Sequence, residues 1–439
     1  MKSNYVEHVI GKLKQNYAAQ FEYLQAIEEL VTYSELDKSL VRSFEDENIL
    51  ERLLQPERVI SFNVSWIDDN NKVHVNQGWR VQHSSLIGPF KGGLRFHPAV
   101  NESVFKFLAL EQTFKNALTG LPIGGAKGGA NFDPKGKSNR EIMRFCQAFM
   151  RELYRHIGPN TDIPAGDINV GTKEIGYLFG CYRRLENKFS GSLTGKEIDF
   201  GGSHARIEST GYGIVYFIEQ VLEKQGRKLS GLTITISGAG NVALNAAKKA
   251  IEVGAKVLTL SNSQGSLYCQ QGFTADIIEK LLSSDSRPDL EKLANKNHGK
   301  WLEGAKPWQV ASDIAIPCAT QNELDMNDAK QLKKNAYSYV FEGANMPCTS
   351  KAVKFIHDSK IFFAPAKAVN SGGVVMSTFE MGQNAMFFPE TFEEMDKKLK
   401  STMADIYINS VGHQSTDCLV GANSFALNKL VRSMIAQGV

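Results

Sequence analysis

The sequence lacks the features that mark secreted, zinc-bound or membrane-spanning proteins. Its six cysteines are scattered over 439 residues, and no two of them form a Cys-x-x-Cys pair. This spacing argues against a disulfide framework or a zinc site and favours free thiols in a reducing compartment, so we expect a cytoplasmic protein. No run of about 18 apolar residues occurs, so no transmembrane helix is expected.

The sequence also lacks an excess of charge of one sign. Fifty basic residues face 47 acidic ones, and the formal net charge is only +3. This balance gives no reason to expect a nucleic acid or an anionic membrane as a partner. No His-Glu-x-x-His or other metal-ligand spacing is present, so no metal is expected, and no Gly-x-Ser-x-Gly elbow indicates a serine hydrolase. Gly136-Lys137-Ser138 resembles the end of a phosphate-binding loop, but Asn131 stands where its first glycine is required.

Hydrophobic spacing in the first half predicts helices around one hairpin. Apolar residues at helical intervals predict an amphipathic helix over 5–30. Strict alternation predicts a β-hairpin over 58–82. Further helices are expected at 102–118, 139–157 and 172–188. A stretch rich in Gly, Ser, Thr and Lys at 190–203 indicates a hinge or linker.

The second half changes to a βαβ pattern. A strand at 232–237, a glycine turn, a helix at 241–253 and a strand at 256–261 follow one another, and further strands are expected at 313–317, 338–342 and 361–364. Such alternation predicts a parallel sheet. We therefore expect an α/β chain of two domains, an N-terminal α/β domain at 1–200 and a Rossmann-like domain at 201–420. A C-terminal helix at about 421–439 is expected to pack back on the first domain.

The glycine turn is the clearest single motif. Gly238-Ala239-Gly240-Asn241-Val242-Ala243 matches G-x-G-x-x-A between a strand and a helix. In this context the first glycine permits the turn, the second lets the backbone approach a pyrophosphate, and the small third residue lets helix and strand pack closely. The helix N-terminus then offers N–H groups and a positive dipole to phosphates. The motif predicts a dinucleotide site.

The next strand ends without an acidic side chain. Ser261, Asn262 and Ser263 stand where an aspartate or glutamate would bind the ribose hydroxyls of NAD. These side chains can donate hydrogen bonds to a 2′-phosphate. We therefore expect NADP as the cofactor, with NAD also possible.

Lysines among glycines mark a second site in the first half. Lys91 precedes Gly92-Gly93, and Lys127 lies between Gly124-Gly125 and Gly128-Gly129. Lys115 falls near the end of the expected 102–118 helix, and Asp167 ends Pro164-Ala165-Gly166-Asp167. Glycines let the backbone crowd against a small molecule. A lysine held away from water near other cations has a lowered pKa and can act as an acid or base near neutral pH, while the other lysines can bind carboxylates.

Taken together, these motifs resemble the hexameric glutamate dehydrogenases of bacteria and lower eukaryotes, over nearly the whole chain. The matching stretches are Gly88-Pro89-Phe90-Lys91-Gly92-Gly93-Leu94-Arg95-Phe96, Glu111–Asn116, Gly124–Gly129, Phe132–Pro134, Pro164–Asp167, Thr210–Gly213, Gly238–Ala243, Glu342–Pro347 and Val369–Gly373. The resemblance implies a substrate and oligomerisation domain followed by the dinucleotide domain. It also implies a homohexamer whose substrates are L-glutamate, 2-oxoglutarate and ammonium.

The resemblance also implies a role for each site residue. Lys91, helped by Ser377, would bind the side-chain carboxylate, and Lys115 would hold the α-carboxylate. Lys127 would be the low-pKa amine that assists attack and loss of water at Cα, and Asp167 would exchange protons with the substrate nitrogen. Substrate binding would further involve Arg206, Asn370 and Val374. Cofactor binding would involve Thr210, Gly238, Ala239, Gly240, Asn241, Val242, Ser261, Asn262, Ser263, Asn345 and Asn370.

Two other functions remain open at this point. A dehydrogenase of an apolar amino acid, such as leucine or phenylalanine, would share the fold and chemistry but would need neither Lys91 nor Ser377. A lysine buried beside an aliphatic substrate would be costly. A non-catalytic nucleotide-binding relative would be expected to lack Lys127 or Asp167, and both are present. Asn262 also departs from the aspartate often found in NADP-linked relatives, which leaves the coenzyme preference open.

Overall fold

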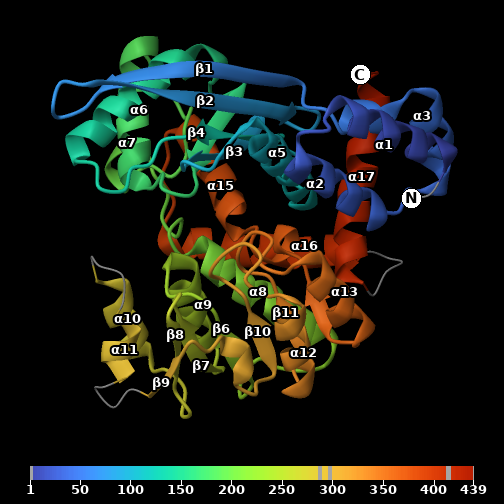
Figure 1. Cartoon of the computed structure of the whole chain (residues 1–439), viewed down its shortest axis with the longest axis vertical. Helices are drawn as coiled ribbons and strands as arrows, with labels where there is room; N and C mark the ends of the chain where they lie inside the picture. Colours follow the sequence, from blue (N-terminus) through green and yellow to red (C-terminus); the bar gives the residue numbers. More distant parts are fainter. Residues whose placement is uncertain (1–2, 285–288, 295–298, 412–416, 439) are drawn as a thin grey trace. The chain divides into compact units, whose positions relative to one another are not determined.

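The computed structural model describes residues 3–284, 289–294, 299–411 and 417–438. The chain forms two compact units, which are labelled by element in Figure 1. Unit 1 comprises Met1–His204, Val374–Met395 and Asn423–Val439, and unit 2 comprises Ala205–Gly373 and Asp396–Ala422. The segment 374–395, which the sequence placed in the second domain, thus belongs to unit 1 by its contacts.

Unit 1 is built on a mixed five-stranded sheet with the strand order β1-β2-β4-β3-β5. The strands are β1 (Arg58–Ile67), β2 (Val73–Ser84), β3 (Phe90–Phe96), β4 (Gly125–Ala130) and β5 (Asp162–Gly166). β1 and β2 are antiparallel, with Ser61 opposite Trp79, which confirms the predicted hairpin. β3 runs parallel to both of its neighbours, β4 and β5. Strand β3 therefore lies between the two strands that carry the other glycine-rich site motifs.

Nine α-helices contribute to unit 1 within the described residues. They are α1 (Asn4–Asn16), α2 (Phe21–Thr32), α3 (Val41–Asp46), α4 (Ile49–Leu53), α5 (Glu102–Leu118), α6 (Asn139–Leu153), α7 (Thr172–Glu186), most of α15 (Gly372–Met386) and most of α17 (Cys418–Gln437). The predicted helices at 102–118, 139–157 and 172–188 are confirmed. The single helix expected over 5–30 is wrong, because α1 and α2 are separate. The Tyr17 hydroxyl bonds to Gln55 and the Tyr23 hydroxyl to the Leu54 carbonyl, so contacts with one chain segment anchor each side of the break.

An aromatic core holds α6 and α7 against the unit 1 sheet. The rings of Phe132 and Phe145 stack with centroids 3.8 Å apart, and Phe96 meets Phe145 edge to face at 5.1 Å. α6 begins with a capping box, in which the Ser138 hydroxyl accepts from the Glu141 N–H and the Glu141 carboxylate accepts from the Ser138 N–H. A second cluster, which includes Val81, Phe105 and Ala109, joins β2 to α5. Strands β3 and β4 consist mostly of buried residues, whereas the edge strand β1 is largely exposed.

Buried His83 on β2 provides a test of this packing. Thr113 Oγ1 donates to the Ala109 carbonyl at 3.0 Å, so it accepts from His83 Nδ1 at 2.9 Å. Burial lowers the pKa of His83 from 6.5 to about 3. The unfolded chain therefore binds one more proton than the folded chain between these pH values, and stability should fall by about 1.4 kcal/mol per pH unit as pH drops below about 6.5.

We expect His83→Gln, which removes this titration, to flatten the pH dependence of stability. The measurement is the free energy of unfolding by urea at about pH 7 and about pH 5 for the wild type and the variant. Equal slopes for the two proteins would show that His83 is not the neutral buried group described above.

Unit 2 contains a seven-stranded sheet with the order β12-β11-β10-β6-β7-β8-β9. The strands are β6 (Thr233–Ile236), β7 (Lys256–Ser261), β8 (Gly265–Tyr268), β9 (Lys300–Glu303), β10 (Ile314–Ile316), β11 (Tyr339–Phe341) and β12 (Phe362–Ala364). The five strands from β12 to β7 are parallel, as predicted. β8 and β9 were not predicted and add an antiparallel edge. The Asn262 side chain closes a turn onto Gln264 and Gly265, and this turn is too short for a parallel crossover.

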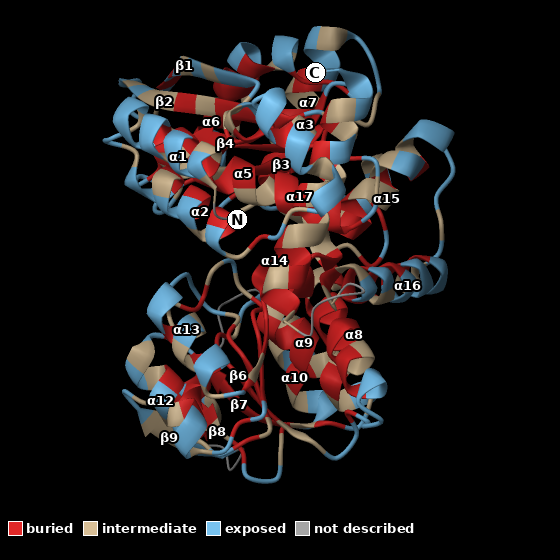
Figure 2. Ribbon diagram, turned by 90° about the vertical axis from the view of Figure 1, so that its right-hand side faces the viewer, coloured by how far each residue is buried: buried red, intermediate tan, exposed pale blue. Residues whose placement is uncertain are grey.

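Helices complete unit 2, and α8 and α9 carry many of its buried residues (Figure 2). The helices are α8 (Ser209–Lys224), α9 (Asn241–Glu252), α10 (Ala275–Leu282), α11 (Leu290–Leu293), α12 (Met326–Lys334), α13 (Ser350–Asp358), α14 (Ala366–Val369) and most of α16 (Phe392–Val411). Across the described ranges, no helix combines the length and apolar character needed to cross a bilayer.

Candidate active site

The glycine turn of unit 2 has the backbone that its sequence predicts. Gly238 has φ +85°, a conformation that side chains disfavour, and Gly240 is the N-cap of α9. No side chain caps α9, and a Cβ on Gly240 would meet open space. The first N–H groups of α9 are therefore open to a phosphate, and the helix dipole favours an anion there. This geometry fits a dinucleotide.

The end of β7 lies directly beside this turn. The Ser261 hydroxyl accepts from the Gly238 N–H at 2.9 Å, so this side chain supports the turn, and it is buried. The Asn262 side-chain oxygen, Oδ1, accepts from the Gln264 and Gly265 backbone N–H groups at 2.8 and 3.2 Å. Its amide nitrogen and the exposed Ser263 hydroxyl are the donors that remain at this edge. Of the three expected phosphate donors, only Asn262 and Ser263 are exposed, because Ser261 is buried against the turn.

The other expected residues of unit 2 fall into two small groups. Asn370 donates to the Asn345 side-chain oxygen at 3.0 Å and to the carbonyls of Gly343 and Ala344 at 3.2 Å. Separately, a Cβ on Gly373 would lie 2.7 Å from Thr210 Oγ1 and 3.7 Å from Arg206 Nη1. Gly373 therefore lets the first turn of α8 and the segment before it approach the start of α15.

In unit 1, the parallel strands bring Lys127 and Asp167 together. Lys127 on β4 places Nζ 3.4 Å from Asp167 Oδ1, just beyond β5. Arg95, on the intervening strand β3, donates from Nε to Asp167 Oδ2 at 2.7 Å. A Cβ on Gly93 would lie 2.8 Å from the Asp167 Cβ, so glycine is required there. Arg95 was not among the expected site residues, although its place two residues after Gly93 on a site strand could have indicated it.

Burial and charge set the protonation states of this cluster. Burial lowers the pKa of Lys127, and nearby Arg95 lowers it further, against an opposing effect of Asp167. Burial raises the pKa of Asp167, but Lys127 and Arg95 outweigh it and hold that pKa at about 2. Asp167 is therefore a carboxylate throughout the neutral range. Lys127 is an amine from which a proton is more readily lost than from an exposed lysine.

Lys91 is 1% exposed, and its Nζ donates to Thr194 Oγ1 at 2.7 Å. Thr194 is itself held by a bond from its N–H to the Pro164 carbonyl at 3.0 Å. Thr194 lies in the stretch 190–203, which was predicted to be a hinge or linker. The stretch is largely irregular, as a linker is expected to be, but Ser192, Leu193 and Thr194 in it are fully buried. Composition indicated a loop but gave no sign of these contacts.

The remaining expected residues of unit 1 lie on α5 and α15. Lys115 occupies the last turn of α5. Its neighbour Asn116 donates to the Lys91 carbonyl at 3.3 Å, which fixes the end of α5 beside β3. Val374 and buried Ser377 lie on α15. Among the described residues, no cluster of three His, Cys, Asp or Glu side chains could hold a metal ion.

Comparisons with known proteins agree over the whole chain. A family model described as Glutamate/Leucine/Phenylalanine/Valine dehydrogenase matches residues 201–438, and one described as Glu/Leu/Phe/Val dehydrogenase, dimerisation domain, matches residues 56–184. The NAD-specific glutamate dehydrogenase of Clostridium symbiosum is 46% identical, with 100% of this chain and 99% of that protein covered. The NADP-specific glutamate dehydrogenase of Escherichia coli is also 46% identical, with 99% of this chain and 98% of that protein covered.

A solved structure gives the same result. The glutamate dehydrogenase of Plasmodium falciparum superimposes with a TM-score of 0.95 at 45% identity, with 100% of this chain and 97% of that one covered. The two-domain α/β fold predicted from the sequence is confirmed. One family model covers more than half of the chain and the relatives match nearly all of it, so the chain belongs to the glutamate/leucine/phenylalanine/valine dehydrogenase family.

Proposed function

We propose that this protein is an NAD(P)-dependent glutamate dehydrogenase, which reversibly deaminates L-glutamate to 2-oxoglutarate and ammonium. The observation that carries the proposal is Lys91, a fully buried cation bonded to a threonine hydroxyl in a glycine-lined strand. A buried ammonium beside a hydroxyl is suited to bind an anion, and a carboxylate at the end of a substrate side chain would be such an anion. The names of the two relatives, an NAD-specific and an NADP-specific glutamate dehydrogenase, support the same conclusion.

Within unit 1, Lys91 and the hydroxyls of Thr194 and Ser377 would bind the side-chain carboxylate, and Val374 would contact the aliphatic part. Lys115 would hold the α-carboxylate. Charge-assisted hydrogen bonds of this kind are shorter and stronger than neutral ones and fix orientation. Arg206 and Asn370 of unit 2 are further proposed substrate residues.

The chemistry follows from the states of Lys127 and Asp167. Oxidation removes a hydride from Cα and a proton from the substrate nitrogen, leaving 2-iminoglutarate. A bound nicotinamide would supply the acceptor for this hydride. The Asp167 carboxylate, kept ionised by Arg95 and Lys127, would take the proton from the nitrogen. Lys127, whose pKa is lowered, would accept a proton from the attacking water at Cα and return it as ammonia leaves.

The residues that would hold the dinucleotide lie around the glycine turn. The N-terminus of α9, with Gly238, Ala239, Gly240, Asn241 and Val242, would bind the pyrophosphate. Asn262 and Ser263 would face the adenosine ribose and Ser261 would support the turn, while Thr210, Asn345 and Asn370 would lie toward the nicotinamide. We propose NADP as the preferred coenzyme with NAD also used, because no carboxylate at the end of β7 repels a 2′-phosphate.

Assembly and location complete the proposal. We propose a homohexamer, by resemblance to the family. The edge strand β1 supports an assembly, because it carries exposed apolar residues such as Ile67 that a partner could cover. We propose a cytoplasmic location, because all six cysteines are free thiols. Metabolites rather than nucleic acids or membranes would be its partners.

The proposed reaction is tested by initial rates of coenzyme reduction with L-glutamate, with NADP and NAD in parallel. We expect turnover with both and a higher kcat/KM with NADP. A higher kcat/KM with NAD would support the proposed reaction but contradict the proposed preference for NADP. No turnover with either coenzyme, from folded protein, would exclude the proposed function.

A further inference from the structure

A buried ion pair joins two segments that are far apart in the sequence of unit 1. Lys196 Nζ lies 2.7 Å from Glu380 Oε1, and the two side chains are 1% and 0% exposed. Glu380 on α15 also accepts from the Gly195 N–H at 2.8 Å, and Lys196 Nζ donates to the Leu193 carbonyl at 2.5 Å. The pair therefore binds the backbone on both sides of Thr194.

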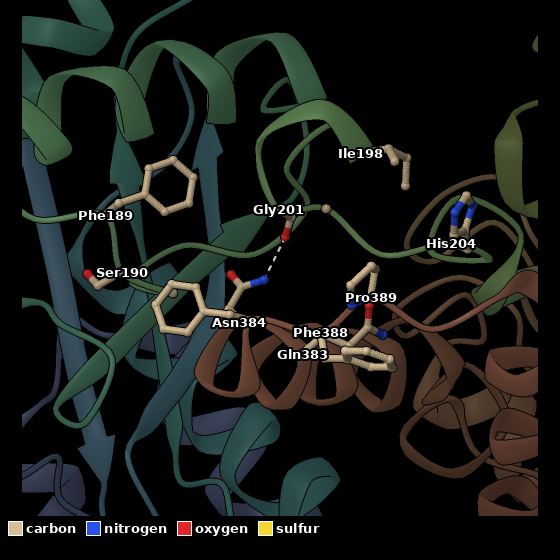
Figure 3. Close-up of a pocket in the computed structure, with 12 residues that line it drawn as sticks. Phe189, Ser190, Ile198, Gly201, His204, Gln383, Asn384, Phe388 and Pro389 are labelled. Carbon is tan, nitrogen blue, oxygen red and sulfur yellow. Dashed lines mark hydrogen bonds between the residues drawn. The ribbon is translucent and has the colours of Figure 1, made fainter.

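Two further contacts fix the same segment to the next turn of α15. Gln383 donates to Ser203 Oγ at 3.0 Å, and Asn384 donates to the Gly201 carbonyl at 2.7 Å. Figure 3 shows Asn384 reaching from α15 toward Gly201, with the hydrogen bond between them dashed. These two contacts hold the later part of the segment, whereas Lys196 and Glu380 bind the residues on either side of Thr194.

The position of the pair relates it to Lys91. Thr194 lies two residues before Lys196 and accepts the hydrogen bond from Lys91 Nζ. Ser377 lies three residues before Glu380, and residues three apart share one face of a helix. The pair thus links the backbone that carries one hydroxyl to the helix face that carries the other.

We propose that Lys196 and Glu380 are positioning residues for recognition of the substrate's side-chain carboxylate. They set the separation of the Thr194 and Ser377 hydroxyls around Lys91 without touching the substrate. This inference rests on the proposed function, in which Lys91 binds that carboxylate. Loss of the pair should weaken binding of a substrate with a side-chain carboxylate and leave a substrate without one unaffected.

The test is Glu380→Gln, which keeps the shape and an acceptor oxygen but removes the charge. We expect KM for L-glutamate to rise about 10- to 100-fold, the scale on which small misplacements of binding groups act, with a much smaller change in kcat. The kcat/KM for L-norvaline, whose side chain has no carboxylate, should change less than about 3-fold. KM for the coenzyme should be unchanged.

Two variants guard against a loss of folding. Lys196→Met/Glu380→Leu removes both charges and so avoids a lone buried ion, and it should show the same selective rise in KM. Glu141→Gln changes another buried glutamate of unit 1, at the start of α6, and should lower thermal stability without altering the ratio of the two substrates. Equal losses of kcat/KM for both substrates in the Glu380 variants would show a merely structural pair and overturn the proposal.

A fourth variant separates this inference from the proposed function. If Lys91→Met lowers kcat/KM selectively for L-glutamate while the Glu380 variants do not, the positioning role is wrong and the proposed function stands. If Lys91→Met leaves the ratio of the two substrates unchanged, carboxylate recognition by Lys91 is itself wrong, and the inference fails with it.

Discussion

Alanine in place of Lys127 should lower kcat for L-glutamate by roughly 10²- to 10⁴-fold, the contribution usual for a positioned acid–base group. The reason is its buried amine, whose pKa is lowered and which lies 3.4 Å from Asp167. No other lysine is described this close to Asp167. The measurement is steady-state kcat with saturating L-glutamate and coenzyme, together with the thermal midpoint of the variant.

The fold should survive this substitution, because Arg95 still pairs with Asp167 at 2.7 Å. Lys135→Ala, on an exposed loop of the same unit, is the matched control and should keep wild-type activity. A Lys127→Ala protein that folds normally and turns over within about 10-fold of the wild type would remove Lys127 from the proposed chemistry.

Methionine in place of Lys91 should change which substrate the enzyme prefers. Methionine keeps much of the volume but offers no charge, so the kcat/KM for L-glutamate should fall by roughly 10³-fold or more, as expected when a buried polar partner is lost. The kcat/KM for L-norvaline should stay level or rise, because its aliphatic side chain would no longer be buried beside a cation, which is unfavourable.

Thr194→Val offers a graded comparison with Lys91→Met. Valine matches threonine in shape but removes the hydroxyl that Lys91 bonds, so a smaller selective loss for L-glutamate is expected. Equal decreases in kcat/KM for L-glutamate and L-norvaline in the Lys91 variant would contradict a role in side-chain recognition. They would favour a contribution to the strand itself.

The elements with the strongest local patterns could be predicted from the sequence. The hairpin at 58–84, helix α5 and the β6–turn–α9 unit follow from period-2 and helical spacing and from glycine chemistry. Edge strands β8 and β9 could not, because they are short and depend on a turn closed by the Asn262 side chain. The break between α1 and α2 likewise depends on tyrosine hydroxyls that bond to distant backbone and side-chain atoms.

The residues of the candidate site also differ in how far the sequence could predict them. Lys91, Lys127 and Asp167 could be identified because glycines crowd around them. Thr194 and the Lys196–Glu380 pair could not be identified, because they lie in a stretch whose composition is that of a loop. Its burial follows from contacts with α15, which lies nearly 200 residues further along the chain. Arg95 was overlooked because its partner, Asp167, is brought close only by the parallel pairing of β3 and β5.

The most direct test of carboxylate recognition is competition between two oxo acids at the wild-type enzyme. Initial rates would be measured with ammonium, reduced coenzyme and either 2-oxoglutarate or 2-oxopentanoate, which has the same chain length but no second carboxylate. We predict a kcat/KM at least about 10³-fold higher for 2-oxoglutarate, as the loss of a buried charged contact implies. Equal values, or a preference for 2-oxopentanoate, would contradict the account and place the enzyme among the dehydrogenases of apolar amino acids.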